Sequence, residues 1–172
     1  MKKGEGKIMK NINVNKLAKI AMVAALYAVL TVAIAPISYG EFQFRLSEVM
    51  VLLAFIDPLY IPGLVLGCAI SNLFSPLGII DVFVGSFATF LSVHMISKSK
   101  NLFVATLWPV LFNGVIVGAE LYYVYQLPFL LTSFQVAFGE FIVVSIVGYI
   151  AFRIIVQDKN IINALKIGNI RV

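Results

Sequence analysis

Charged residues are scarce in this sequence. Of its 172 residues, 13 are lysine or arginine and 8 are aspartate or glutamate, so 12% are charged. Soluble domains are about a quarter charged, and a water-soluble fold of this chain would leave large apolar patches exposed. We therefore expect lipid to be part of the solvent around it.

Residues that form disulfides or ligate metals are also scarce. The sequence has one cysteine, Cys68, and one histidine, His94. The single cysteine excludes an intramolecular disulfide and a Cys-rich metal site, and the single histidine excludes multi-histidine zinc or haem ligation. We expect Cys68 to be a packing residue and His94 to be structural, with no metal and no cofactor.

Common enzyme motifs are missing as well. The sequence contains neither GxxxxGK[ST] nor GxSxG. The first absence excludes ATP hydrolysis by a Walker A site, and the second excludes the usual nucleophile elbow of hydrolases. The chain is therefore not expected to be an enzyme.

Long apolar runs make up most of the chain, which is 61% hydrophobic with a mean hydropathy of +1.00. The runs are continuously apolar rather than alternating, which favours helices over a membrane barrel. They cover residues 17–36, 46–56, 61–74, 79–96, 102–123 and 129–156. The prediction is an all-α, polytopic membrane protein with a six-transmembrane-helix bundle. Runs 46–56 and 61–74 are short and bounded by proline, which is typical of broken helices around a binding site.

The distribution of basic residues predicts the orientation. With an even number of spans and both termini in the cytoplasm, twelve of the thirteen basic residues lie on the cytoplasmic side, as the positive-inside rule requires. They are Lys2, Lys3, Lys7, Lys10, Lys16, Lys19, Lys98, Lys100, Arg153, Lys159, Lys166 and Arg171. The expected organisation is a basic cytoplasmic segment (1–16), a six-helix domain in the cell membrane (17–156) and a cytoplasmic tail (157–172). Arg45 is the thirteenth basic residue, and on this topology it lies on the outer side of the membrane.

Polar side chains within the apolar runs are the candidate functional residues, because ionisable groups at membrane depth are costly. On this topology most of them lie in the outer half of the spans, at a similar depth, which predicts a small-ligand pocket with an apolar floor. The candidate substrate-binding residues are Gln43, Arg45, Glu48, Asn72, Asp81, Asn113, Glu120, Gln135 and Glu140.

The excess of acids predicts the kind of ligand. Four carboxyl groups against one arginine favour a ligand that is cationic or rich in donors, since a carboxylate accepts the N–H pair of an amidine or guanine-type edge. Tyr39, Phe42, Phe44 or Trp108 are available to stack on a flat ring. The alternative is local: Arg45 pairs with Glu48 one turn later, and Asp81 caps the following helix.

The first apolar run also carries small residues at helical spacing. Ala21/Ala25 and Ala24/Ala28 form two small-xxx-small pairs, a spacing that lets membrane helices approach closely. Gly63/Gly67 and Gly114/Gly118 repeat the pattern. These pairs either dock a partner or pack inside the chain.

Several stretches resemble a known family. They are the alanine-rich stretch from Ala21 to Ala28, QFRLSE (43–48), IPGLVLGC (61–68), NLFSPLGIID (72–81), PVLFNG (109–114) and Gly139-Glu140. The chain is similar over 17–153 to the substrate-binding S-components of energy-coupling factor (ECF) transporters, and more closely to the queuosine-precursor family QueT.

The resemblance implies a division of labour. An S-component captures substrate, while a scaffold transmembrane subunit and two ABC ATPases supply energy. By analogy, Ala21, Ala24, Ala25 and Ala28 dock on the scaffold, and the loop after the first helix gates the pocket. The implied substrate is a 7-deazaguanine-type base such as aminomethyl-deazaguanine or queuine. The alternatives are an S-component for another flat, vitamin-like molecule and a stand-alone secondary carrier.

Overall fold

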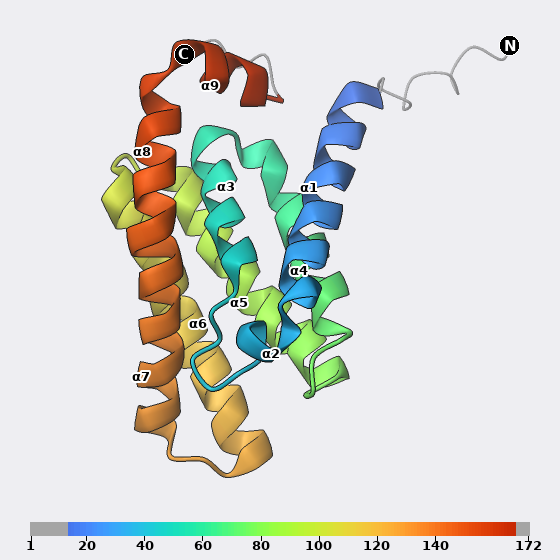
Figure 1. Ribbon diagram of the computed structural model, residues 1–172, viewed down its shortest axis with the longest axis vertical. Coiled ribbons are helices and arrows are strands. Elements are labelled where there is room, and N and C mark those ends of the chain that lie inside the picture. Colours follow the sequence, from blue (N-terminus) through green and yellow to red (C-terminus); the bar gives the residue numbers. More distant parts are fainter. Residues whose placement is uncertain (1–13, 168–172) are drawn as a thin grey trace, which may run out of the picture.

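A computed structural model describes residues 14–167, which are helical throughout their regular structure, with no strand among them (Figure 1). The first half contains α1 (Val14–Ala33), α2 (Ala35–Ser38), η1 (Leu46–Leu52), α3 (Leu53–Ile56), η2 (Pro58–Tyr60) and α4 (Ile61–Asn72). The second half contains α5 (Ile79–Lys98), α6 (Leu102–Tyr125), α7 (Phe129–Glu140), η3 (Phe141–Gly148), α8 (Tyr149–Gln157) and α9 (Lys159–Leu165). The all-α prediction is confirmed.

Four helices are long and apolar enough to cross a membrane: Val14–Ala33, Ile79–Lys98, Leu102–Tyr125 and Phe129–Gln157. The apolar helices Leu46–Ile56 and Pro58–Asn72 are shorter than the roughly 20 residues that a span requires. The prediction that these two runs are short is confirmed, whereas the count of six membrane-spanning helices stays a prediction. The chain has the architecture of a multi-pass membrane protein, with four helices of spanning length among residues 14–167.

Small residues bring neighbouring helices into backbone contact. A Cβ atom at Gly67 of α4 would lie 2.8 Å from the carbonyl oxygen of Ala24 on α1. A Cβ atom at Gly118 of α6 would lie 2.6 Å from Cα of Ser133 on α7. Both distances are too short for a real side chain, so the glycine pairs serve packing inside the chain, between α1 and α4 and between α6 and α7.

The alanines of α1 divide between two faces. Ala24 and Ala28 are 2% and 9% exposed and belong to the face that packs on α4. Ala21 and Ala25 are exposed. Ala21 and Ala25 are therefore open to a partner, whereas Ala24 and Ala28 pack inside the chain, and docking on a scaffold stays a prediction.

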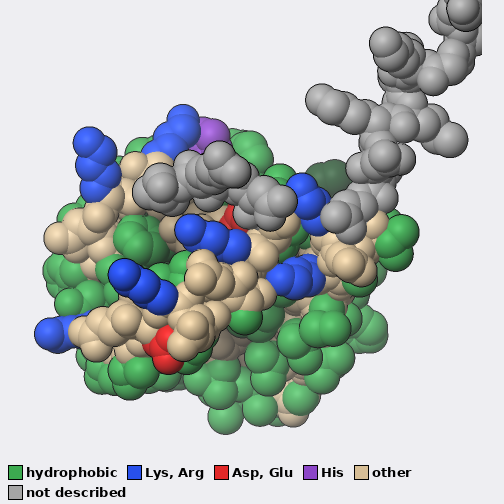
Figure 2. All heavy atoms as spheres, turned by 90° about the horizontal axis from the view of Figure 1, so that it is seen from above, with side chains coloured by type: hydrophobic (Ala, Val, Ile, Leu, Met, Phe, Trp, Pro, Cys, Tyr) green, Lys and Arg blue, Asp and Glu red, His purple; other side chains and the backbone are tan. Residues whose placement is uncertain are grey.

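The two ends of the bundle hold different elements (Figure 1). One end, which we call the basic end, holds the start of α1, the α5–α6 connection and α9; the other, the loop end, holds residues 39–45, 73–78 and 126–128. Lys and Arg side chains gather on the face seen from above in Figure 2. They include Lys16, Lys19, Lys98, Lys100, Arg153, Lys159 and Lys166, whereas Lys2, Lys3, Lys7, Lys10 and Arg171 lie outside the described residues.

Residues 159–167 pack across the basic end of the bundle. The Lys19 ammonium donates to the carbonyl oxygen of Ala164 (2.8 Å), and the backbone amide of Ile167 donates to Oδ2 of Asp57 (2.8 Å). The Ile167 side chain is buried with the main core. Residues 159–167 therefore tie the first helix, the α3–η2 junction and the last helix together.

The long helix Phe129–Gln157 is not a regular α-helix along its whole length. Residues Phe141–Gly148 form a π-helix directly after Glu140. π-helical segments are rare and occur frequently at functional sites. Glu140 directly precedes this segment and the buried Ser145 lies within it.

Candidate functional site

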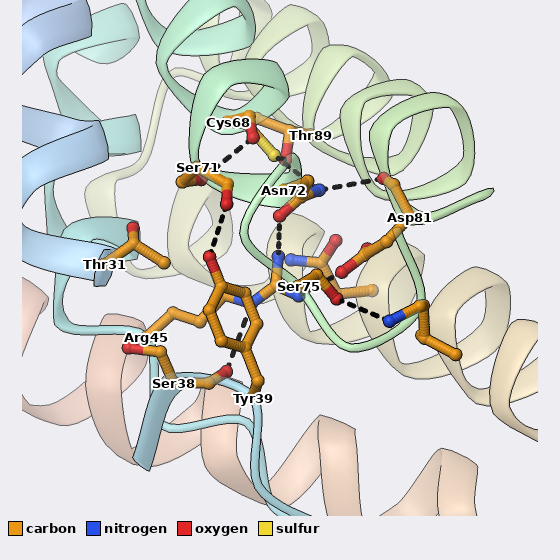
Figure 3. A network of polar contacts seen from close by, with 12 residues as sticks. Thr31, Ser38, Tyr39, Arg45, Cys68, Ser71, Asn72, Ser75, Asp81 and Thr89 are labelled. Atoms are coloured by element: carbon orange, nitrogen blue, oxygen red, sulfur yellow. Dashed lines mark hydrogen bonds and ion pairs between the residues drawn. The ribbon is translucent and has the colours of Figure 1, made fainter. Parts of the chain in front are cut away.

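Arg45 is the centre of a buried polar network near the loop end (Figure 3). Its Nη1 donates to Oδ1 of Asn72 (3.2 Å), its Nη2 pairs with Oδ2 of Asp81 (3.3 Å), and its Nε donates to the carbonyl oxygen of Ser38 (3.3 Å). The Arg45 and Asp81 side chains are 4% and 1% exposed. A guanidinium group suits this place because its fan of donors reaches three acceptors at once.

Local structure aims Arg45 inward. It occupies the N-cap position of η1, at the end of the loop that follows α2. The Tyr39 ring lies 5.4 Å from the guanidinium carbon, in cation–π geometry, and the Tyr39 hydroxyl donates to the carbonyl oxygen of Ser71. Burial raises the pKa of the Tyr39 hydroxyl, with the neighbouring Arg45 charge opposing that shift.

The two local alternatives are wrong. Arg45 forms its ion pair with Asp81, which is 36 residues away, and not with Glu48. Asp81 lies in the first turn of α5 but does not cap it, because Gly78 holds the N-cap position with a φ of +60°. Only glycine adopts that backbone conformation readily. Because Asp81 does not cap the helix, its carboxylate is available to pair with Arg45.

A second polar group lies deeper along the helices. The Tyr27 hydroxyl of α1 donates to Oε1 of Glu48, and Nδ2 of Asn113 donates to Oε1 of Glu140 (2.8 Å). Glu140 also interacts electrostatically with Glu48 and with Arg45. Separate helical segments thus bring six of the nine predicted residues into one connected region: Arg45, Glu48, Asn72, Asp81, Asn113 and Glu140.

Glu120 has no hydrogen-bond partner for either carboxyl oxygen, although its side chain is only 5% exposed. It interacts electrostatically with Asp81 and Arg45, and it borders an open apolar groove between α5 and α6 on the surface of the bundle. Glu48, Asp81 and Glu140 each have one further oxygen without a partner. The cluster therefore has more buried acceptor oxygens than the protein supplies with donors. Buried acceptors without donors are costly, which favours a ligand that donates hydrogen bonds here.

The two predicted glutamines belong to the loop end and not to the deeper group. Gln43 is buried, with a φ of 48°, in the loop that leads to Arg45. Gln135 is half-buried, donates to Oε2 of Glu41 (3.4 Å), and lines a cavity of about 240 Å³ with Tyr39 and Tyr125. Glu41 of the loop and Gln135 of α7 thus both line this cavity and contact each other.

The loop after α2 is pressed against α7 at a glycine. A Cβ atom at Gly139 would overlap the carbonyl oxygen of Phe42. The Phe42 ring stacks on Phe44 at a centroid distance of 5.8 Å and meets Phe138 edge-on at 6.0 Å. Phe42 and Phe44 thus hold the loop against the bundle, immediately before Arg45 in the chain.

The predicted residues do not share a single depth. Asn113 and Glu120 lie seven residues apart on the same continuous helix, which separates them by about 10 Å along its axis. The prediction placed most of the candidates, not all of them, at a similar depth, and Asn113 is nearer the middle of α6 than Glu120 is. The polar groups extend from the loop end toward the middle of the bundle.

Sequence reasoning missed Tyr27. It is fully buried and donates to Glu48, yet it stands in an alanine-rich apolar helix where an aromatic residue suggests packing. Thr31 and Ser47 were missed too; their hydroxyl oxygens lie 2.6 Å apart. The available signal was spacing, since Tyr27 and Thr31 lie one turn apart on the same face of α1 as Ala24 and Ala28.

Comparison with known proteins gives the family. The model of the family described as QueT transporter matches residues 17–157. The chain belongs to the QueT transporter family. It is 36% identical over 149 residues to the queuosine precursor transporter QueT of Lactococcus lactis subsp. cremoris (strain MG1363), covering 77% of this chain and 88% of that protein. No solved structure matches the chain.

The QueT match fits the chemistry of the site. QueT proteins are transporters and not enzymes, which agrees with a multi-pass helical bundle whose buried polar groups accept hydrogen bonds. The match ends at residue 157, so α9 and the segment that crosses the basic end lie beyond the part that the family model covers.

Proposed function

We propose that this QueT-family chain is the substrate-binding S-component of an ECF importer, and that it captures a 7-deazaguanine-type queuosine precursor such as aminomethyl-deazaguanine or queuine. One observation carries the proposal: four carboxyl groups from different helical segments converge on a buried region with a single guanidinium, and five of their oxygens have no donor. A planar base rich in N–H groups supplies the missing donors.

The proposal includes the topology. The six helical segments cross or enter the membrane with both termini in the cytoplasm, so that the basic end is cytoplasmic and the loop end faces outside. The basic residues on α1, α5, α8 and α9 support this orientation, because positive charge is enriched on the cytoplasmic side. The loop after α2 is then the outer gate of the site.

The proposal also assigns the partners. A scaffold transmembrane subunit and two ABC ATPases supply the energy of transport, and the exposed alanines of α1, Ala21 and Ala25, dock on the scaffold. Their exposure together with Met22 and Val29 supports this assignment, since an apolar helix face with small residues suits close helix–helix contact.

Two measurements test the proposal. Native mass spectrometry of the purified protein is expected to detect a bound deazapurine base, and cellular uptake of that base is expected to stop when the ATPase module is removed. A different flat molecule in the spectrum would point to another substrate. Uptake that continues without the ATPases would identify a secondary carrier and refute the S-component assignment.

A further inference from the structure

The four buried acids differ in how many oxygen atoms they offer to a ligand. Glu48 and Glu140 each have one oxygen that accepts from the protein, from Tyr27 and Asn113, and one that has no partner. Asp81 uses one oxygen for Arg45. Glu120 is the one acid of this cluster with both oxygens unpartnered, and it is 5% exposed.

The number of available oxygens decides which donor group each acid can bind. The N1–H and exocyclic N–H groups of a guanine-type edge are parallel, so they need both oxygens of one carboxylate. Glu120 meets that requirement. Glu48 and Glu140 do not, since each has a protein donor on its other oxygen.

Glu48 and Glu140 instead suit a compact cation. Their charges interact with each other, and the nearest guanidinium, Arg45, is already paired with Asp81. An ammonium group carries three donors that point in different directions and binds as a point charge, so it is well matched to single oxygens from two carboxylates. A cation placed there relieves the repulsion between the two acids.

The spacing of the two places fits one ligand. Asn113, which holds Glu140, precedes Glu120 by seven residues on α6, a separation of about 10 Å along the helix axis. A ligand that reaches both must carry an amine and a hydrogen-bonding edge at opposite ends. Aminomethyl-deazaguanine has that form, with its amine on the five-membered ring and its N–H pair on the six-membered ring.

We infer that Glu120 binds the paired N–H groups of the base, and that Glu48 and Glu140 together bind the ammonium group. The inference rests on the proposed function and refines it. The protein then selects ligands by charge: it takes a deazaguanine with a protonated amine and discriminates against the same base with a hydrogen or a neutral nitrile in place of the aminomethyl group.

The test compares two ligands on the purified full chain in lipid nanodiscs. Isothermal titration calorimetry measures the affinities of aminomethyl-deazaguanine and of 7-deazaguanine, which has the same edge but no amine. Glu140→Gln is expected to weaken binding of the amine ligand about 10- to 100-fold, because a hydrogen bond to a charged group is lost, and to leave the affinity for 7-deazaguanine unchanged. Glu120→Gln is expected to weaken both ligands by a similar factor.

Controls separate the possible failures. Asp158→Asn changes an exposed acid that caps α9 at the basic end, and it should bind both ligands as the unaltered protein does. If Glu140→Gln does not fold, Glu48→Gln tests the same half of the inference. Equal losses for both ligands in the Glu140 or Glu48 variant, or no loss in Glu120→Gln, would overturn the inference. Failure of the unaltered protein to bind either ligand would instead refute the proposed function.

Discussion

Replacing Arg45 by methionine should destabilise the protein more than replacing its partner Asp81 by asparagine. At their 3.3 Å separation, an effective dielectric constant of about 20 gives an attraction of about 5 kcal/mol. Removal of one member of a buried ion pair costs about 3–5 kcal/mol. Arg45→Met should reach this range, because it leaves four acids in the cluster with no cation among them.

Asp81→Asn should cost less, at most about half as much. The guanidinium of Arg45 keeps its hydrogen bonds to Asn72 and Ser38 and still interacts with Glu48, Glu120 and Glu140. The double variant should recover part of the loss caused by Arg45→Met, since it removes one of the unpaired acids.

Equilibrium unfolding in detergent micelles measures these differences. The single tryptophan, Trp108, reports on unfolding of α6 by its fluorescence. Lys98→Met, an exposed change at the basic end, is the control and should stay within about 0.5 kcal/mol of the unaltered protein. Equal losses for Arg45→Met and Asp81→Asn, or losses of both below about 1 kcal/mol, would refute the argument from unequal charge.

Three further predictions concern the loop, the deeper acids and the C-terminal segment. Gly139→Val should prevent the loop after α2 from closing against α7 and speed ligand dissociation about 5- to 150-fold, as overpacking of about 1–3 kcal/mol implies; stopped-flow dissociation at the unaltered rate would contradict this. Tyr27→Phe should destabilise by about 1–3 kcal/mol, because an oxygen of Glu48 loses its donor, and the same fluorescence measurement checks it. Deletion of 158–172 should lower the melting temperature, since Asp57 then loses a backbone donor and the core loses an apolar side chain; an unchanged melting temperature would show that the segment does not stabilise the bundle.

The sequence predicts the class of fold well and the pairing of its residues poorly. Continuous apolar runs specify helices, and the shortness of 46–56 and 61–74 predicts that these segments do not span the bilayer alone. Arg45 stands out as a lone basic residue, but its pairing with Asp81 depends on how α5 and η1 pack, which spacing along the chain does not encode.

The faces of a helix are equally hard to assign from spacing alone. Ala21/Ala25 and Ala24/Ala28 have the same separation, yet one pair is exposed and the other is buried against α4. Gly67 decides between them, because it makes room for the backbone of α1 at Ala24. That contact joins residues 43 positions apart, so no local pattern predicts which pair faces inward.

The glycine contacts have a mechanical consequence for the bundle. Where Gly67 meets Ala24 and Gly118 meets Ser133, no layer of side chains remains that could slide, so α1 with α4 and α6 with α7 behave as two stiff pairs. Between these pairs lie α5 and the buried polar groups around Arg45. Movement of one helix pair relative to the other should therefore occur at α5 and the buried carboxyl groups, and the packing within each pair should stay unchanged.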